Sequence, residues 1–175
     1  MEAGRARLET REVPRFTAAH DRLWRQDEAH FPVAVVRDAS YLNWKYVDQP
    51  GQSVVRLELA GDDGVRAVAI VSISDADATY RYRRAWLTDL VVRPDDPDLV
   101  WSVFEAVRVA SLRLGADLLI FDVISDLFVK NALAFGFARR EAVSFGPPWA
   151  RSCLAMFIVV TCMSSLTVKF LFRIA

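Results

Sequence analysis

Apolar positions recur at helical spacing near the start of the chain. They predict one amphipathic helix over residues 14–30, whose apolar face consists of Phe16, Ala19, Leu23 and Trp24. A second, shorter helix is predicted over residues 38–46, because Asp38 can cap its first turn and Pro50-Gly51 closes the segment. The aromatic residues of these two helices fit either a packed core or the wall of a substrate pocket.

The pattern then changes to strands. Residues 53–60 alternate between apolar and polar side chains, which predicts a half-buried strand, and a Gly-Asp-Asp-Gly turn follows at 61–64. Residues 65–73 are apolar at nearly every position, so this hairpin partner is expected to be covered on both faces. The next strand is predicted over residues 85–92. Three consecutive antiparallel strands are therefore expected.

Helices and strands alternate in the next part of the chain. Asp96 and Pro97 fit the cap and first position of a helix that runs to about residue 114, with an apolar stripe facing a core. A buried strand is predicted over residues 117–124, parallel to the strand before the helix, which makes a right-handed βαβ unit. A helix over residues 126–134 and a strand over 138–145 complete the regular pattern.

Composition narrows the class of protein. The chain has 175 residues, of which 53% are hydrophobic and 25% charged, as expected for one globular domain with an appendage. Its formal net charge is zero, so no overall field attracts nucleic acid or an anionic membrane. The two cysteines indicate no disulfide framework, and residues 1–14 hold no apolar stretch typical of a signal peptide. We expect a cytoplasmic protein.

Three short motifs, in this order of elements, resemble the GNAT acyltransferase superfamily. Residues 87–94, Leu-Thr-Asp-Leu-Val-Val-Arg-Pro, are similar to the family's fourth strand and its exit, and residues 133–137, Leu-Ala-Phe-Gly-Phe, to its closing signature. Residues 41–46, Tyr-Leu-Asn-Trp-Lys-Tyr, are similar to a segment of GNAT-like proteins of one bacterial subgroup. The implied fold class is α/β, with a mainly antiparallel mixed sheet, a βαβ crossover and flanking helices.

The resemblance also implies an activity, which is transfer of an acyl group from acetyl-CoA to an amine, on a small molecule or a sugar. The cofactor would lie where the fourth strand and the parallel fifth strand part. Val91, Val92 and Arg93 match the strand exit that binds the pantetheine arm, and Ser125 matches a cofactor-contacting position. Ser125 fits a plain helix cap equally well. The alternative functions are a GNAT-shaped binding domain without turnover and a tail-anchored membrane-associated protein.

The chain departs from the family at two positions. Its phosphate loop is Arg-Pro-Asp-Asp-Pro-Asp at 93–98, without the glycines that let backbone amides approach phosphate. The three aspartates fit a helix cap, and a metal or substrate-amine site is the alternative. The tyrosine that serves the family as general acid is replaced by Ala132, which donates no proton.

Two carboxylates and two histidines are the remaining candidates for chemistry. Asp89 on the fourth strand and Glu58 on the second are the candidate general bases, and each fits an ordinary ion-paired strand residue as well. His20 and His30 are ten residues apart on one helix, a spacing that does not favour a shared metal ion. No metal site is predicted.

The last 25 residues differ from the rest of the chain. Residues 1–150 are predicted to form the GNAT-like domain and residues 151–175 an apolar tail, which contains no acidic residue. Residues 152–168 carry no charge and approach the length of a membrane span, whereas residues 154–161 fit a buried last strand. A third alternative is a segment that is not native to this fold, because similar GNAT-like proteins usually end in an acidic stretch. Membrane contact is expected only through this tail.

Overall fold

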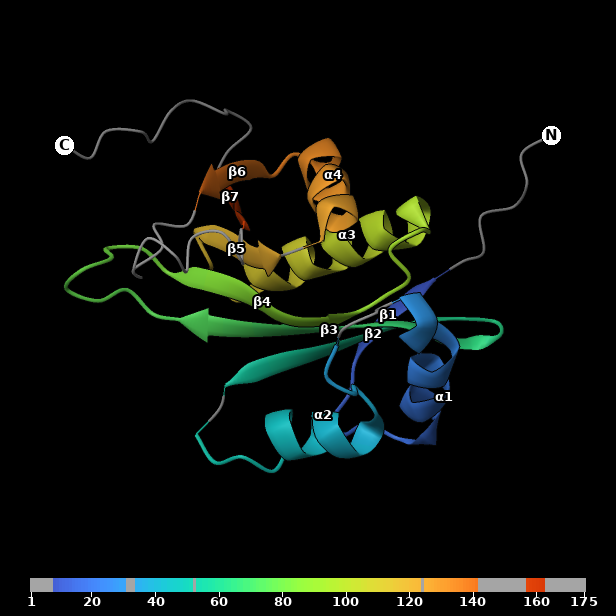
Figure 1. Ribbon diagram of the computed structural model, residues 1–175. Helices are drawn as coiled ribbons and strands as arrows, with labels where there is room; N and C mark the ends of the chain where they lie inside the picture. Colours follow the sequence, from blue (N-terminus) through green and yellow to red (C-terminus); the bar gives the residue numbers. More distant parts are fainter. Residues whose placement is uncertain (1–7, 31–33, 52, 124, 142–156, 163–175) are drawn as a thin grey trace, which may run out of the picture.

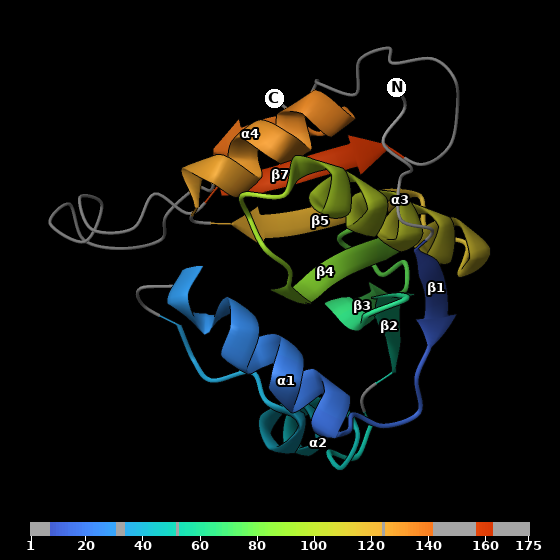
Figure 2. The same ribbon diagram turned by 90° about the vertical axis from the view of Figure 1, so that its right-hand side faces the viewer.

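The computed structural model describes residues 8–30, 34–51, 53–123, 125–141 and 157–162. A seven-stranded sheet runs through the molecule in the order β1-β2-β3-β4-β5-β7-β6. Neighbouring strands are antiparallel except β4 and β5, which are parallel. Helices α1 and α2 cover one face of the sheet, and α3 and α4 cover the other (Figures 1 and 2). This is the predicted α/β class with its βαβ crossover.

Helices and strands follow one another along the chain in a mixed order. Their bounds are β1 Glu9–Glu12, α1 Ala18–Asp27, the 3₁₀ helix η1 Glu28–His30, α2 Ala39–Tyr46, β2 Val54–Gly61, β3 Gly64–Ser74, β4 Arg84–Val91, α3 Pro97–Arg113, β5 Leu118–Val123, α4 Asp126–Phe135, β6 Ala138–Glu141 and β7 Phe157–Cys162.

Most predicted elements occur where the pattern places them, and two differences have a clear cause. The first helix begins at Ala18 instead of near Pro14, because Thr17 is its cap and exchanges hydrogen bonds with His20 and Ala19. Strand β1 has no counterpart among the predictions. Its four residues are all exposed at the sheet edge, so the segment shows no apolar face.

Two apolar clusters hold the helices on the sheet. The cluster under α3 and α4 is centred on Phe104, which is fully buried and contacts the rings of Phe121, Phe135 and Phe137. The cluster under α1 and α2 packs helix residues such as Leu23 against Val68, Ile70 and Val91 of β3 and β4. Side chains on opposite faces of β4 therefore meet different cores.

Part of the C-terminal tail is a strand of the sheet. Phe157–Cys162 forms β7, which pairs with β5 on one side and β6 on the other. The predicted last strand overlaps this segment, whereas the predicted boundary near residue 150 falls outside the described residues. Within the described part of the chain, no helix combines the length and apolarity needed to cross a bilayer.

Candidate active site

The parallel strands β4 and β5 pair along only the first half of β4. Their pairing runs from Arg84 with Leu118 to Leu87 with Phe121 and stops there. Strand β4 continues to Val91 beside β3, and β5 continues to Val123 beside β7 (Figure 2). The opening that the predicted donor site requires is therefore present in the sheet.

A bulge in β4 lies where the strands separate. Opposite β3, Ile70 faces Asp89 but the next residue, Val71, faces Leu87, so Thr88 is the extra residue. The Thr88 hydroxyl donates to the Ile70 carbonyl oxygen at 3.1 Å. A bulge bends its strand and increases the local twist, which turns the end of β4 away from β5.

The predicted cofactor residues at the end of β4 lie beyond the last residue that pairs with β5. The side chains of Val91 and Val92 are buried, one in the core under α1 and the other in the core under α3. Only their peptide groups are placed to meet a ligand between the strands. Arg93 follows the strand end and is exposed, and its guanidinium pairs with Asp95 at 3.3 Å.

Asp89 lies at the bulge and is surrounded by hydrogen-bond donors. Its Oδ1 accepts from Arg37 Nε at 2.5 Å and from the Leu90 amide at 3.0 Å. Its Oδ2 accepts from the Tyr46 hydroxyl at 2.8 Å and lies 3.5 Å from Lys45 Nζ. The Asp89 side chain is 4% exposed, so this carboxylate is enclosed and both of its oxygens are occupied.

Tyr46 keeps its proton in this arrangement. Burial is the main cause that raises the pKa of its hydroxyl, and the Asp89 carboxylate raises it further. Lys45 lies over the rings of Tyr41 and Tyr46, 5.4 and 4.9 Å from their centroids. The cluster thus places two cations and one proton donor around a single carboxylate.

Glu58 on β2 forms a second enclosed group, two strands further from the opening than Asp89. Its Oε1 accepts from Arg11 at 2.6 Å and 2.9 Å, and its Oε2 lies 3.0 Å from His20 Nε2. His20 Nδ1 accepts the Thr17 amide, so the ring proton is on Nε2 and faces Glu58, although the angle is poor for a hydrogen bond. Burial lowers the pKa of His20. The structure does not bring Glu58 and Asp89 together.

Asp122 on β5 is a candidate that the sequence pattern did not single out. It follows Phe121, the last β5 residue paired with β4, whose side chain faces α3. Because side chains alternate along a strand, Asp122 faces the same side of the sheet as Asp89. It is exposed and has no hydrogen bond or ion pair among the described residues. Partial burial raises the pKa of this carboxyl.

Helix α4 begins beside the same opening. Ser125 occupies its cap position with extended backbone, as predicted, but within the described residues its side chain makes no capping hydrogen bond. Its hydroxyl is therefore not used by the helix. Ala132 on this helix is fully buried, and the helix is capped by Gly136, whose φ of 110° lies in the left-handed region.

The connection from β4 to α3 is acidic, and the carboxylates of Asp95 and Asp96 bind to other groups of the chain. Asp96 caps α3, with its Oδ1 accepting the Leu99 amide at 3.0 Å, and its Oδ2 lies 3.6 Å from Arg66. Asp95 pairs with Arg93 and lies 3.7 Å from His30. The acidic loop thus acts as a helix cap, and the described residues contain no group of side chains suited to a metal ion. This loop does not fit a pyrophosphate, because its carboxylates already hold a helix amide and the neighbouring guanidinium groups.

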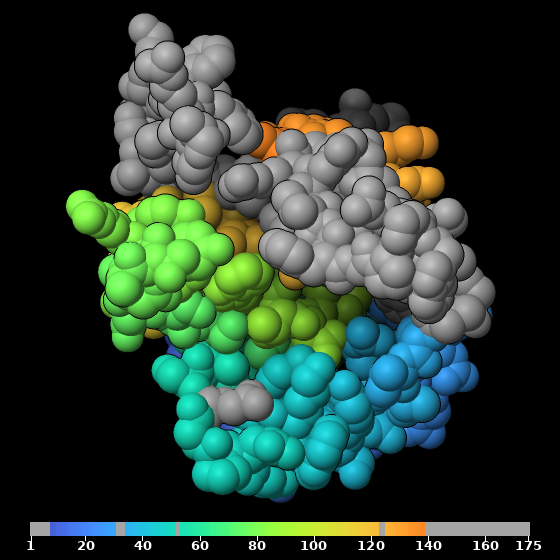
Figure 3. Space-filling model, turned by 60° about the vertical axis from the view of Figure 1, so that its left-hand side comes forward, coloured from blue at the N-terminus to red at the C-terminus, as the bar shows by residue number. Residues whose placement is uncertain are grey.

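A hollow lies next to the bulge on the α2 side. Its volume is about 410 Å³, and its polar lining comes from Lys45, Tyr46, Ser53, Ser72 and Thr88. The space-filling view shows the segment from α2 to β2 next to the β3–β4 connection on this side (Figure 3). It is a candidate place for an acceptor molecule.

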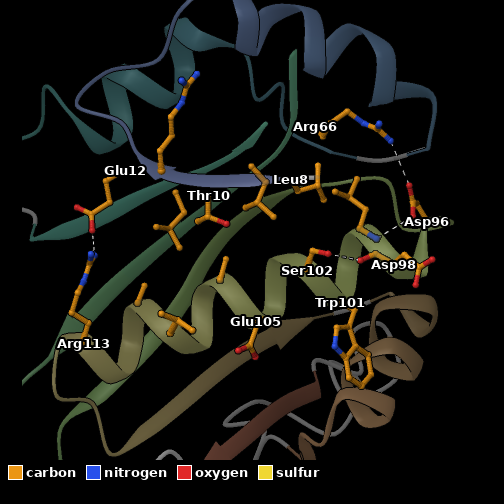
Figure 4. A pocket seen from close by; sticks show the side chains of 17 residues that line it. Leu8, Thr10, Glu12, Arg66, Asp96, Asp98, Trp101, Ser102, Glu105 and Arg113 are labelled. Carbon is orange, nitrogen blue, oxygen red and sulfur yellow. Dashed lines mark hydrogen bonds and ion pairs between the residues drawn. The ribbon is translucent and has the colours of Figure 1, made fainter. Parts of the chain in front are cut away.

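A larger groove lies on the other face of the sheet. It runs between β1 and α3, with a volume of about 760 Å³ (Figure 4). Ion pairs join its walls at both ends, between Arg113 and Glu12 and between Arg66 and Asp96. None of Asp89, Asp122 and Ser125 lines it. The larger groove therefore lies apart from the candidate reactive residues, and its volume does not make it the active site.

Comparisons with known proteins find similar structures but no similar sequences. No family model and no curated protein matches the sequence. A putative acetyltransferase, YncA from Salmonella typhimurium solved with acetyl-CoA, is similar in structure, with a TM-score of 0.60 and 13% identity over 93% of this chain and 96% of that one. The GNAT domain of S. lividans PAT has a TM-score of 0.62 and 10% identity, covering 89% and 90%.

A third solved structure is similar over nearly the whole of both chains. The ribosomal-protein-S18-alanine N-acetyltransferase from Escherichia coli has a TM-score of 0.58 and 14% identity, with 95% of this chain and 100% of that chain covered. All three similarities extend over most of both chains, at sequence identities that establish the fold alone. The chain therefore has the GNAT fold, the fold of this superfamily of N-acetyltransferases.

Proposed function

We propose that this chain is an acyl-CoA-dependent N-acyltransferase that moves an acetyl or similar group to an amine of a small molecule or sugar. The observation that carries the proposal is the parting of β4 and β5 after Leu87 and Phe121, next to a bulge in β4. The solved relative with bound acetyl-CoA supports the donor. The opening supplies unpaired strand backbone to one side of the donor arm.

The donor arm is proposed to lie along β4 between that strand and α4. The peptide groups of Val91 and Val92 and the start of Arg93 face the arm, which carries amide groups of its own. The Ser125 hydroxyl contributes a further hydrogen bond, because helix α4 leaves it unused. The positive end of α4 lies beside the reacting carbonyl, where negative charge develops.

The acceptor amine is proposed to enter from the hollow beside Thr88. Its nitrogen forms a bond to the thioester carbonyl carbon, and the bond from that carbon to sulfur breaks. Asp122 accepts the proton that the nitrogen loses and passes it to the thiolate, so that the products are an amide and a thiol. A free carboxylate with a raised pKa is suited to both transfers.

Asp89 and Glu58, the bases predicted from sequence, have a different place in this proposal. Every oxygen of both carboxylates already lies against a cation, a hydroxyl, an amide or an imidazole. We assign Asp89 the positioning of Arg37 and Tyr46 at the opening. Glu58 ties β1 to α1 through Arg11 and His20.

A binding domain without turnover is the second candidate function. Two observations favour it, namely the acidic loop before α3 and Ala132 at the position of the family's proton donor. The two functions differ in one outcome. A binding domain retains an acyl thioester unchanged, whereas an enzyme releases free thiol when a suitable amine is present.

Titration calorimetry with acetyl-CoA, followed by thiol release across a panel of amines, tests the proposal. Ser125→Trp fills the opening and is expected to weaken acetyl-CoA binding more than about tenfold by steric exclusion. Ser102→Trp is the matched control, because Ser102 lines the larger groove instead. Binding that is lost in Ser102→Trp and kept in Ser125→Trp would place the ligand in that groove and refute the proposal.

A further inference from the structure

The connection between β4 and α3 carries negative charges that would repel the phosphates of a nucleotide. Asp95, Asp96 and Asp98 lie within four residues of one another where a donor leaving the opening would carry its phosphates. The nearby guanidinium groups are already engaged, Arg93 with Asp95 and Arg66 with Asp96, and the His30 ring lies 3.7 Å from Asp95. A pyrophosphate bound here would compete with these carboxylates for the same guanidinium groups and would be repelled by their charge.

The N-terminus of α3 offers few free amides. Pro97 is the first helical residue and has no N–H group. The Leu99 amide donates to the Asp96 side chain and the Val100 amide to the Asp96 carbonyl oxygen, both at 3.0 Å. The groups that make a helix N-terminus attract anions are therefore mostly satisfied within the chain.

A fourth carboxylate approaches the same place from α1. Asp27 is 3% exposed, and its Oδ2 has no hydrogen-bond partner in the described part of the chain. Burial is the main cause that raises its pKa, while Arg93, His30 and Arg66 are near enough to lower it. Asp27 therefore adds a further carboxyl group next to Arg93 and Arg66, the cations that pair with this connection.

We infer that this chain recognises its acyl donor through the thioester and the pantetheine arm, and that the nucleotide of CoA adds no net affinity. The substrate class then includes acyl thioesters of pantetheine itself as well as acyl-CoA. This inference rests on the proposed function, because it assumes that the opening between β4 and β5 holds the donor. The opening supplies backbone contacts to the arm, while the loop opposes the phosphates.

The test compares the binding of acetyl-CoA and S-acetyl-pantetheine to the full chain by calorimetry. We expect dissociation constants within about fivefold of each other, since the nucleotide makes no favourable contact. Raising the salt concentration to about 0.5 M should leave acetyl-CoA binding unchanged or tighter, because screening weakens repulsion as well as attraction.

A pair of matched variants tests the charge argument directly. Asp95→Asn removes one carboxylate and releases Arg93, so acetyl-CoA should bind about two- to fivefold tighter while S-acetyl-pantetheine binds as before. Asp75→Asn is the control, since this aspartate pairs with Arg83 near the other end of β4. It should change neither ligand.

Two results would overturn the inference in distinguishable ways. A preference for acetyl-CoA greater than about fivefold, weakened by salt, refutes it and leaves the proposed function standing. Failure of both thioesters to bind refutes the proposed function as well, because the opening would then hold no donor.

Discussion

Replacing Asp89 by Asn tests whether this carboxylate holds the wall of the opening together. The substitution preserves the shape of the side chain but removes its charge and replaces one acceptor oxygen with an amino group. That group must face either Arg37 or Tyr46, both of which are donors. One partner therefore loses its hydrogen bond in a buried place.

The expected loss follows from the exposure of the partners. Breaking a fully buried ion pair from one side costs about 3–5 kcal/mol. The side chains of Arg37 and Lys45 are 26% and 37% exposed, so water compensates part of that loss. We expect Asp89→Asn to lower the free energy of unfolding by about 2–4 kcal/mol.

Urea unfolding followed by tryptophan fluorescence measures this loss, with the denaturant slope held as a check on two-state behaviour. Tyr46→Phe alone should lose about 1 kcal/mol, and in the double variant it should lose less, because the Asn side chain leaves a single uncharged oxygen for the donors around it. Asp75→Asn is the exposed control and should change stability by less than about 0.5 kcal/mol. A loss below about 0.5 kcal/mol for Asp89→Asn, equal to this control, would refute the account of the cluster.

Three further results are expected. Asp122→Asn should lower turnover at least about tenfold and leave acetyl-CoA binding unchanged, since the residue accepts a proton and does not hold the donor; equal losses in both would contradict that role. Folding lowers the pKa of His20 from 6.5, so the neutral ring stabilises the fold fully above pH 6.5 and this contribution decreases as the pH falls below it. The free energy of unfolding, measured in urea between pH 7.5 and 5, should therefore fall more steeply in the parent than in His20→Asn. Gly136→Ala places a side chain at a φ of 110° and should cost about 1–2 kcal/mol in the same assay, whereas Gly61→Ala, without a positive φ, should cost less.

The main elements of the fold could be predicted because their signals are local. The stripe of α3, the alternation of β2 and the Gly-Asp-Asp-Gly turn each depend on neighbours within one element. Strand β1 escaped prediction because an exposed edge strand of polar and charged residues has no apolar face. Its Arg11 nevertheless reaches Glu58 across the sheet edge, a contact that only the folded chain reveals.

The candidate site was harder to predict, because it depends on elements that meet only in the tertiary structure. Asp89 was identified from its strand, but the approach of Arg37 and Tyr46 depends on how α2 crosses β4. Asp122 ends an apolar run, and nothing local distinguishes it from any polar residue at a strand end. Its position beside the opening follows from the register of β4 against β5.

The place of β7 in the sheet has a consequence for the order in which the protein can fold on the ribosome. Strand β6 has β7 as its sole neighbour among the described strands, although β6 precedes β7 in the chain. Residues 138–141 therefore wait without a strand partner until residues 157–162 have left the exit tunnel. The first five strands can pair before then, so synthesis exposes an unfinished sheet edge at β5 that a nascent-chain chaperone is suited to shield.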